Sequence, residues 1–448
     1  MSLTNATPEA AAKAAKSASH ILATLPASAR NDALTAIHAA LSDAKDEILH
    51  ANARDLELAR KAAADGQLKD SLVSRLDLGK KGKWEDMLKG ILDVRDLPDP
   101  VGKITLRTRL DDGLLLERVT APIGVLLIIF EARPEVIANI ASLAIKSGNA
   151  AILKGGKEST ESFVAISRTI SAALAGTKVP NGAVQLVTTR DAIAGLLDQD
   201  RHIDLVIPRG SNELVRYIKT NTKIPVLGHA DGICHSYLTA DVDEKTAVDV
   251  VVDSKTSYPA ACNSLETLLV QDKALNTVFP AVADALLAKG VELRCDGPSK
   301  AALSGKQGNI VDVKQEDYDT EHLSLTLSIK TVSSLEEAVE HINEHGSHHT
   351  DTILTSDKEL AERFMDAVDS AGVYWNASSR FADGMRYGFG TEVGISTNKI
   401  HARGPVGLEG LMIYKYKIRG QGHVTSVYGE GEGQRRFKHE TLRLEDGH

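Results

Sequence analysis

The feature that most constrains the fold is a succession of short apolar runs that alternate with helical stretches. Residues 125–130 read Val-Leu-Leu-Ile-Ile-Phe, which is one strand length without a polar side chain, and residues 134–147 follow with a helical period. The pattern recurs at residues 150–153, 184–187 and 204–207, each run again followed by a helical stretch. Strands that are apolar on both faces are typical of a parallel sheet covered by helices on both sides. We therefore predict a doubly wound α/β sheet.

A second α/β series begins near Ile233 and continues through residues 265–270, 272–289 and 291–295. Two successive blocks of this size in 448 residues indicate two lobes with a ligand cleft between them. The predicted domains are a cofactor-binding domain of residues 1–103 and 120–230, a catalytic domain of residues 231–410, and a small arm of residues 104–119 and 411–448.

The arm is predicted from strand signals outside the two blocks. Residues 104–110 and 114–119 flank Asp-Asp-Gly at 111–113, which is a hairpin signal. In residues 411–419 apolar and aromatic side chains alternate with mostly basic ones, as in a half-buried strand. We expect the hairpin and this strand to join across subunits, which makes the protein at least a dimer.

Composition and charge exclude several classes of protein. The 52 Lys and Arg against 61 Asp and Glu give a net charge of −9, which argues against a general binder of nucleic acid or anionic membranes. The longest apolar run has only the six residues 125–130, far short of a membrane span. Three cysteines without a CxxC pair argue against a disulfide framework and fit a reducing compartment. We expect a cytoplasmic enzyme.

Cys262 is the candidate nucleophile. It stands in Ser-Tyr-Pro-Ala-Ala-Cys-Asn-Ser at 257–264, immediately before an apolar strand. Small neighbours on a turn leave space for a substrate carbonyl, and local backbone N–H groups can receive an oxyanion. The alternative is a small buried hydrophobe, which is what most free cysteines are. Cys234 and Cys295 lie in apolar-flanked segments, where this second interpretation is favoured.

Two basic features suggest anion binding. Lys154 follows the strand at 150–153 and so lies at a carboxyl end, where doubly wound sheets place their ligands. The polar loop with Ser379 and Arg380, and the later Arg403, suit a phosphate or carboxylate. The alternative in both cases is solvated surface charge.

Other patterns fail as motifs. Residues 388–394 have the spacing GxGxxxG and follow no buried strand, so they are no dinucleotide fingerprint, and the chain has no P-loop. His341, His345, His348 and His349 suggest a metal-dependent hydrolase as an alternative function. HExxH is absent and no acidic third ligand has clear spacing, so no metal is predicted.

Taken in order along the chain, these segments resemble the aldehyde dehydrogenase superfamily over about residues 120–415. The landmarks are residues 148–154, Pro-Arg-Gly-Ser at 208–211, residues 228–235, Cys262 and the loop 381–394. Within the superfamily the chain resembles the γ-glutamyl phosphate reductase family, also called glutamate-5-semialdehyde dehydrogenases. Residues 332–353, with the histidine cluster, agree with that family's signature at every specified position, and residues 130–134 and 401–409 are equally distinctive.

The resemblance implies that Cys262 is the nucleophile and that an NADP-type cofactor binds without GxGxxG. Lys154 matches the family's lysine near the adenosine ribose, and Gly210 and Ser211 match its turn near the pyrophosphate. Glu321 matches the glutamate that holds the nicotinamide ribose. Lys154 and Lys157 suit a 2′-phosphate, so NADPH is favoured over NADH.

Departures from the hydrolytic aldehyde dehydrogenases suggest acyl-phosphate chemistry. Those enzymes carry a glutamate base where this chain has Gly-His-Ala-Asp-Gly at 228–232, with His229 the nearest occupant. A cysteine thioester would then survive long enough to be reduced. The amide of the family's oxyanion hole falls at Ala132, so backbone N–H of Cys262 with a donor from Asn263 is the expected replacement. The candidate substrate contacts are Glu131 for an ammonium group, and Arg133, Ser379, Arg380 and Arg403 for carboxylate or phosphate.

The function that this resemblance implies is NADPH-dependent reduction of L-glutamyl 5-phosphate to L-glutamate 5-semialdehyde and phosphate through a Cys262 thioester, the second step of proline biosynthesis. The expected partners are the small-molecule substrate, further copies of the chain and a functional link to glutamate 5-kinase. The alternatives are a hydrolytic aldehyde dehydrogenase, the metal-dependent hydrolase and a catalytically silent scaffold.

Overall fold

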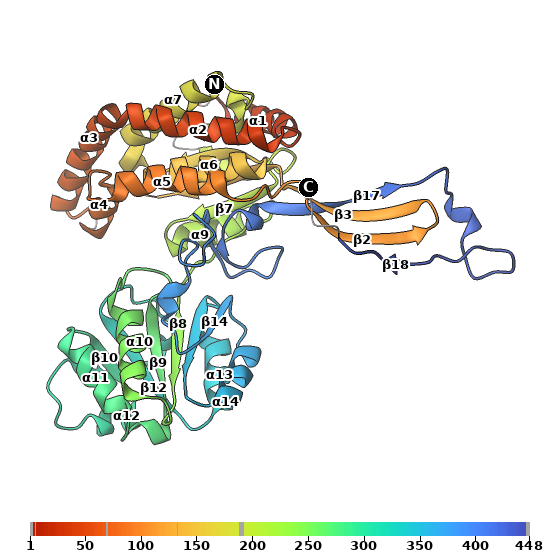
Figure 1. The fold of residues 1–448 in the computed structure, drawn as a ribbon. Coiled ribbons are helices and arrows are strands. Elements are labelled where there is room, and N and C mark those ends of the chain that lie inside the picture. The colour runs from red at the N-terminus through yellow and green to blue at the C-terminus, as the bar shows by residue number, and fades with distance from the viewer. Residues whose placement is uncertain (1–2, 5, 69, 132, 188–191, 445–448) are drawn as a thin grey trace.

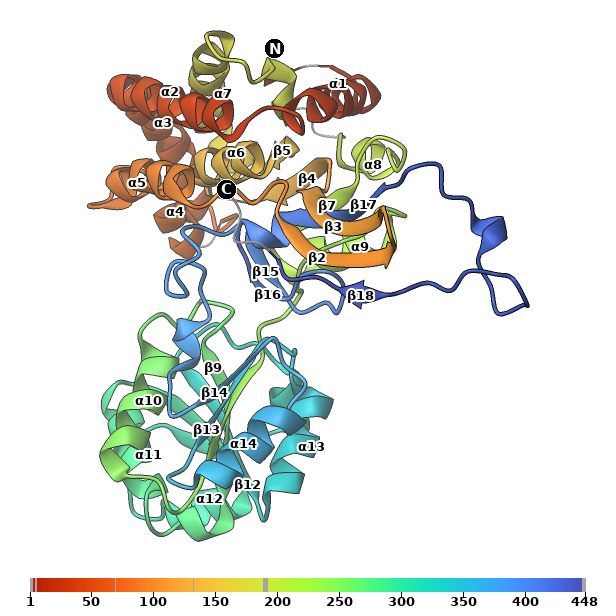
Figure 2. The same ribbon diagram turned by 45° about the vertical axis from the view of Figure 1, so that its right-hand side comes forward.

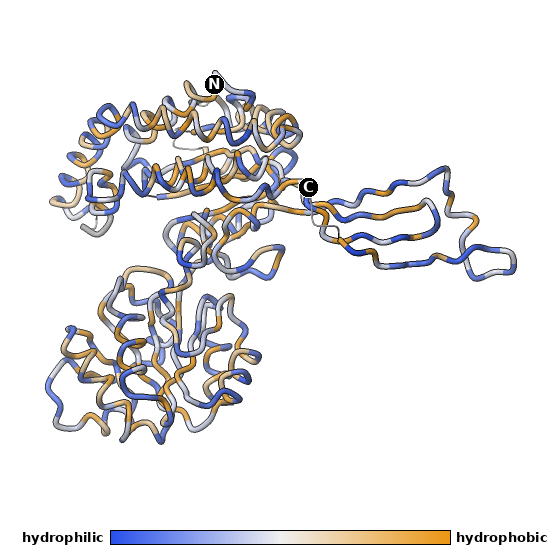
Figure 3. Tube along the Cα trace, in the orientation of Figure 1, coloured by the Kyte–Doolittle hydropathy of each residue, from blue (hydrophilic) through white to orange (hydrophobic). Residues whose placement is uncertain are grey.

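The computed structural model describes residues 3–4, 6–68, 70–131, 133–187 and 192–444. Two α/β lobes lie one above the other in Figure 1, and an extended arm of strands projects to one side. Hydrophobic segments run along the strands inside both lobes, while the outer helices alternate between hydrophilic and hydrophobic stretches (Figure 3). None of the helices in these ranges combines the length and the apolar character that a membrane crossing requires.

The first lobe is built on a five-stranded parallel sheet of order β1-β6-β5-β4-β7. Strand β4, which lies between β5 and β7, is buried throughout and packs alternate side chains into two cores, one on each face of the sheet. The doubly wound prediction is therefore confirmed for this lobe. Its strands are β1 Leu3–Thr4, β4 Val125–Phe130, β5 Ala150–Gly155, β6 Val184–Val187 and β7 Leu205–Arg209. Its helices are α1 Pro8–Leu22, α2 Ala27–Asp43, α3 Lys45–Ala64, α4 Asp70–Leu76, α5 Lys83–Asp96, α6 Val136–Ser147, α7 Thr160–Ala175, α8 Ala192–Leu197 and α9 Asn212–Thr220.

The second lobe has a seven-stranded parallel sheet of order β11-β10-β12-β9-β8-β13-β14, seen in Figure 2 with helices on both sides. Along β9, Leu268 and Val270 enter one core and Leu269 enters the other, so this sheet is also doubly wound. Its strands are β8 Cys234–Leu238, β9 Leu265–Gln271, β10 Glu292–Cys295, β11 Ile310–Asp312, β12 Thr326–Val332, β13 Thr350–Leu354 and β14 Gly372–Trp375. Its helices are α10 Glu244–Thr256, α11 Phe279–Ala288, α12 Gly297–Ala302, α13 Leu335–His345 and α14 Lys358–Ala367.

The chain returns to the first lobe before residue 410, so the predicted end of the catalytic domain is too late. Strands β15 Gly394–Ser396 and β16 Gly404–Val406 form a separate two-stranded sheet. Val393 and Leu411 are buried in the core beneath β4, and Asn149 donates a hydrogen bond from Nδ2 to the Leu411 carbonyl at 2.8 Å. Residues 393–411 thus belong to the first lobe by packing.

The arm is a four-stranded sheet of order β17-β3-β2-β18, with β2 Ile104–Asp111, β3 Leu114–Pro122, β17 Met412–Arg419 and β18 Glu440–Thr441. The hairpin prediction is confirmed, with Gly113 at a φ of 73° in the turn. β17 pairs antiparallel with β3 of the same chain from Met412 to Arg419, so the expected pairing of these two strands across subunits is wrong. Within one chain every residue of this edge strand after Met412 is exposed, so the predicted buried face of β17 is not covered by its own chain.

Candidate active site

Four segments that are distant in the sequence meet at the amino edge of the second sheet. His229 and Gly232 come before β8, Cys262 before β9, Glu321 before β12 and His349 before β13. Because parallel strands point the same way, the segments that lead into them gather on one edge. At the first lobe, Lys154 and Arg209 lie at the opposite, carboxyl ends of β5 and β7.

Cys262 lies on a tight turn, and Gly232 packs closely against the backbone of this turn. The Ala261 N–H donates to the Tyr258 carbonyl at 3.1 Å and the Ser264 N–H to the Ala261 carbonyl at 2.9 Å. A side chain at residue 232 would place its Cβ 2.0 Å from the Cys262 carbonyl oxygen, so only glycine lets the segment before β8 pass this close. The Cys262 thiol is half-buried and free, whereas Cys234 and Cys295 are buried.

Two histidines flank the Cys262 thiol. The sulfur atom and one ring nitrogen from each of His229 and His349 lie within 4.8 Å of one another, and the two rings meet edge to face at 5.1 Å. His229 Nδ1 is 2.8 Å from the Ile395 carbonyl oxygen. Since a carbonyl only accepts, Nδ1 carries the proton and a neutral His229 keeps its lone pair on Nε2.

Burial keeps His229 neutral. Removal from water disfavours the imidazolium ion and lowers the pKa of His229, although the hydrogen bond to Ile395 and the nearby Glu321 act in the opposite direction. Burial also raises the pKa of Glu321, while a hydrogen bond from the Gly232 N–H acts to lower it. His229, Glu321 and Gly232 therefore form one cluster beside Cys262.

His349 is a site residue that the sequence does not predict. In the sequence it falls in a group with His341, His345 and His348, but the structure divides that group. The ring centroid of His341 lies 4.4 Å from that of His345 and 5.5 Å from that of His235. Burial lowers the pKa of His341 to about 2. His348 Nδ1 lies 2.7 Å from the Asp369 carbonyl oxygen, away from the Cys262 group. The signal for His349 was its position directly before the buried strand β13, shared with the other site segments.

Two arginine side chains, Arg209 and Arg380, lie close enough to the Cys262 thiol to interact with it electrostatically. Burial lowers the pKa of Arg209, and Arg133 adds to this effect while the charges of Glu392 and Cys262 oppose it. Burial likewise lowers the pKa of Arg380, whose Nε donates to Ser257 Oγ at 3.2 Å. The sequence prediction named Arg133 and Arg380 and missed Arg209. Arg209 and Arg380 thus place positive charge near Cys262 on an acidic protein, with Glu392 partly balancing Arg209.

Two predicted site residues, Asn263 and Ser379, take part in hydrogen bonds that connect the Cys262 turn to the segment 379–382. Asn263 Nδ2 donates to the Ala382 carbonyl at 2.9 Å, and Ser379 Oγ donates to the Asn263 carbonyl at 2.7 Å. Ser379 is completely buried. Within the described ranges the backbone N–H groups of Cys262 and Asn263 have no hydrogen-bond acceptor, which leaves them available to an oxyanion. Ala132, where the superfamily's amide would fall, lies outside the described residues.

Arg403 is engaged elsewhere. Its Nη1 lies 3.2 Å from Asp369 Oδ1 and its Nη2 donates to the Asp369 carbonyl at 3.0 Å. Lys399 pairs with the same carboxylate. The role of Arg403 as a substrate contact stays a prediction.

Four of the five predicted cofactor residues lie at or just after the carboxyl ends of β5 and β7, on either side of β4, whereas Glu321 lies with Cys262 in the second lobe. Lys154 is buried and donates from Nζ to the Gly155 carbonyl at 2.7 Å, and burial lowers its pKa. Lys157 is exposed in the next turn. Ser211 caps α9, and its N–H donates to Glu131 Oε2 at 2.9 Å.

These residues fit a dinucleotide. A Cβ at Gly210 would come within 2.6 Å of Glu131 Oε2, so glycine leaves room for this carboxylate at the turn before α9. The α9 N-terminus already receives the Glu131 carboxylate, and a pyrophosphate group suits the same N–H donors. Glu131 thus lies with the cofactor turn, and its pairing with a substrate ammonium stays a prediction.

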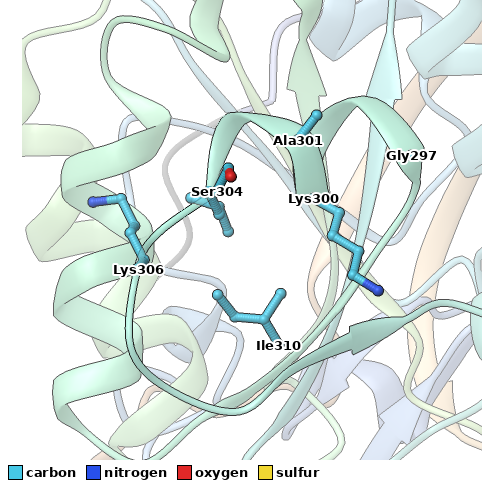
Figure 4. A pocket seen from close by; sticks show the side chains of 7 residues that line it. Gly297, Lys300, Ala301, Ser304, Lys306 and Ile310 are labelled. Atoms are coloured by element: carbon cyan, nitrogen blue, oxygen red, sulfur yellow. The ribbon is translucent and has the colours of Figure 1, made fainter.

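A hollow in the second lobe lies at the other edge of the sheet (Figure 4). It is lined by residues from α12 to β11, which follow the carboxyl end of β10, whereas Cys262 precedes the amino end of the parallel β9. Two lysines at the hollow already have partners, Lys300 with Asp312 and Lys306 with Asp284. The hollow is therefore separate from the site around Cys262.

Comparison with known proteins identifies the family. The aldehyde dehydrogenase family matches residues 1–325. A probable γ-glutamyl phosphate reductase of Schizosaccharomyces pombe is 54% identical over 97% of both chains, and the γ-glutamyl phosphate reductase of Saccharomyces cerevisiae is 52% identical over 97% of both. The chain belongs to the γ-glutamyl phosphate reductase branch of the aldehyde dehydrogenase family. The resemblance found in the sequence is thereby confirmed.

Solved structures agree with this family assignment. The γ-glutamyl phosphate reductase of Thermotoga maritima superposes with a TM-score of 0.89 at 37% identity, covering 94% of this chain and all of the other. An acetylating aldehyde dehydrogenase of Geobacillus thermoglucosidasius has a TM-score of 0.64 at 17% identity over 93% and 97% of the two chains, a likeness of fold alone. These structures confirm the aldehyde-dehydrogenase fold.

Proposed function

We propose that this reductase-family chain converts L-glutamyl 5-phosphate and NADPH to L-glutamate 5-semialdehyde, inorganic phosphate and NADP⁺ in the cytoplasm, as the second step of proline biosynthesis. The observation that carries the proposal is the half-buried thiol of Cys262 between His229 and His349, with Arg209 and Arg380 nearby. A reactive free thiol suits a reducing compartment. Glutamate 5-kinase, which makes the acyl phosphate, is the proposed functional partner.

The first half-reaction forms a thioester. Neutral His229 or His349 accepts the thiol proton, and the Cys262 sulfur attacks the acyl carbon. The carbon–oxygen bond to phosphate then breaks, and phosphate leaves with the bonding electrons. The Cys262 and Asn263 N–H groups stabilise the transient oxyanion, and Arg209 and Arg380 stabilise the phosphate charge.

The second half-reaction releases the aldehyde. Lys154, Lys157, Gly210, Ser211 and Glu321 are the residues that would hold the cofactor. When bound, NADPH supplies the hydride that reduces the thioester carbon. As the carbon–sulfur bond breaks, the histidine that took the proton returns it to the Cys262 sulfur. His229 stands in place of a carboxylate base, so water is not activated against the thioester. The direct test is phosphate-dependent reduction of NADP⁺ by the semialdehyde.

Lys154 is expected to set the preference for NADPH. Removing its charge with Lys154→Met should raise KM for NADPH about 10- to 100-fold, since a hydrogen bond to a charged group contributes about 1.5–3 kcal/mol. KM for NADH, which lacks the 2′-phosphate, should change little and serves as the control. Steady-state kinetics with both cofactors check this. An equal rise in KM for NADH and for NADPH would show that Lys154 does not bind the 2′-phosphate.

We also propose that the arm mediates assembly into at least a dimer. Tyr414, Tyr416 and Ile418 on β17 are 50%, 57% and 61% exposed, an unusual row of apolar side chains on an edge strand. The double substitution Tyr416→Asp and Ile418→Asp is expected to give a monomer, while Lys415→Asp on the same strand leaves the assembly intact. Sedimentation equilibrium at micromolar concentration measures this. A monomeric mass for the unsubstituted protein would refute the proposal.

A further inference from the structure

We propose that His229, Cys262 and His349 form a zinc-binding site, at which a Zn²⁺ ion reversibly blocks the nucleophile. No other group of three or more His, Cys, Asp or Glu in the described part of the chain brings its ligand atoms together in this way. The site depends on the geometry of these three side chains and not on the identity of the substrate. Zinc binding can therefore be tested separately from the proposed reaction, whereas the block of the nucleophile rests on the proposed role of Cys262.

The three ligand atoms suit zinc in kind and in spacing. Thiolate sulfur and imidazole nitrogen are the ligands that Zn²⁺ prefers, at about 2.3 Å and about 2.0–2.1 Å. In a tetrahedron such atoms are roughly 3.4–3.6 Å apart. Here they lie within 4.8 Å of one another, so side-chain movements of about 1 Å close the site. Three protein ligands leave the fourth position to a water molecule.

Both histidines are oriented in advance. The Ile395 carbonyl accepts from His229 Nδ1–H, which fixes the ring and leaves Nε2 as the free ligand nitrogen, the arrangement found behind many zinc-bound histidines. His349 is only 1% exposed, and its Nε2 has no hydrogen-bond partner in the described ranges. A buried nitrogen without a partner costs free energy, and coordination to a metal ion removes that cost.

Binding is a ligand exchange without oxidation or reduction. The Cys262 thiol loses its proton to solvent, the sulfur forms a bond to Zn²⁺, and water molecules leave the ion. The sulfur lone pair that would attack an acyl carbon is then held by the metal. A chelator removes the ion, the thiol is protonated again and the nucleophile is restored.

Alkylation of the full-length protein tests the site without an activity assay. Purified protein is treated with iodoacetamide with and without ZnCl₂, and the modified Cys262 peptide is quantified by mass spectrometry. Equimolar Zn²⁺ is expected to slow alkylation of Cys262 at least about tenfold, and EDTA to restore the rate. CoCl₂ is expected to give a thiolate-to-cobalt charge-transfer band that Cys262→Ser lacks.

Variants separate this site from the other histidines. His229→Gln and His349→Gln should each weaken Zn²⁺ binding at least about tenfold, because even outer-shell changes cost 10- to 100-fold. His345→Gln, in the neighbouring cluster on α13, should bind Zn²⁺ unchanged. Melting temperatures without metal confirm folding, and the cobalt band of Cys262→Ser decides the question if a histidine variant is unstable. The proposal would be overturned by an unchanged alkylation rate in excess Zn²⁺, by histidine variants that bind Zn²⁺ as tightly as the unsubstituted protein, or by a cobalt band that persists in Cys262→Ser.

Discussion

Cys262→Ala is expected to lower the rate of phosphate-dependent NADP⁺ reduction by at least about 10⁴-fold, the scale on which nucleophile removal acts in other covalent enzymes. The thioester cannot form without the sulfur atom, so the cofactor has no acyl group to reduce. Binding groups and oxyanion donors remain, but they stabilise no covalent intermediate. The measurement is kcat/KM for L-glutamate 5-semialdehyde at saturating NADP⁺ and phosphate.

Cys295→Ala is the matched control. Cys295 is the last residue of β10 and lies at the opposite edge of the same sheet, where burial raises the pKa of its thiol to about 11. A thiol with this pKa is protonated near neutrality and inert. This variant should keep activity close to that of the unsubstituted protein. Residual activity above about 1% in Cys262→Ala would contradict a covalent mechanism.

Lys255→Met is expected to lower the free energy of unfolding by about 3–5 kcal/mol. Lys255 and Glu266 are both fully buried beneath the active-site turn, and Lys255 Nζ lies 2.7 Å from Glu266 Oε2 and 2.7 Å from the Leu265 carbonyl. Burial raises the pKa of Glu266 and lowers that of Lys255, and their mutual attraction opposes both shifts. Without the lysine, a buried carboxylate is left uncompensated.

The deficit of Lys255→Met should depend on pH. A carboxyl whose folded-state pKa is raised binds more protons in the folded than in the unfolded state, so it favours folding at low pH and loses this effect as pH rises. Removing Lys255 removes the charge that opposes the rise, so the deficit should be larger at pH 8 than at pH 5. Urea unfolding at both pH values measures it.

The double substitution Lys255→Met and Glu266→Leu is the control. It removes both charges and should recover at least half of the lost stability, because a buried pair can be replaced by apolar side chains at little cost. Glu266 Oε1 also accepts from the Leu323 N–H at 3.2 Å, two residues after Glu321. The double variant is therefore expected to fold well while KM for the cofactor rises. A loss below about 1 kcal/mol for Lys255→Met would contradict this account of the pair.

What could be predicted from the sequence was local in origin. The apolar run at β4 specified a strand buried on both faces, and the Asp-Asp-Gly turn specified the β2–β3 hairpin. Lys154 could be assigned to the carboxyl end of a strand because its strand directly precedes it. Small residues around Cys262 indicated an open turn, although only the family resemblance distinguished it from a buried cysteine.

What could not be predicted depends on contacts between distant segments. His349 and Arg209 come near Cys262 because separate strands of two sheets begin or end close together, and no local pattern in the sequence predicts that meeting. The alternation in 412–419 indicates a strand but not its partner, which is β3 of the same chain. The same alternation suggested a buried face, but no layer covers β17 within one chain.

The most direct test of the proposed reaction is the phosphate dependence of NADP⁺ reduction by L-glutamate 5-semialdehyde. The account predicts a rate that is negligible without phosphate, rises hyperbolically with phosphate and is slower with NAD⁺. The thioester must be released by phosphate, since His229 stands where the hydrolytic enzymes carry the carboxylate base that activates water. An equal rate without phosphate, with glutamate as the product, would contradict the account and identify a hydrolytic aldehyde dehydrogenase.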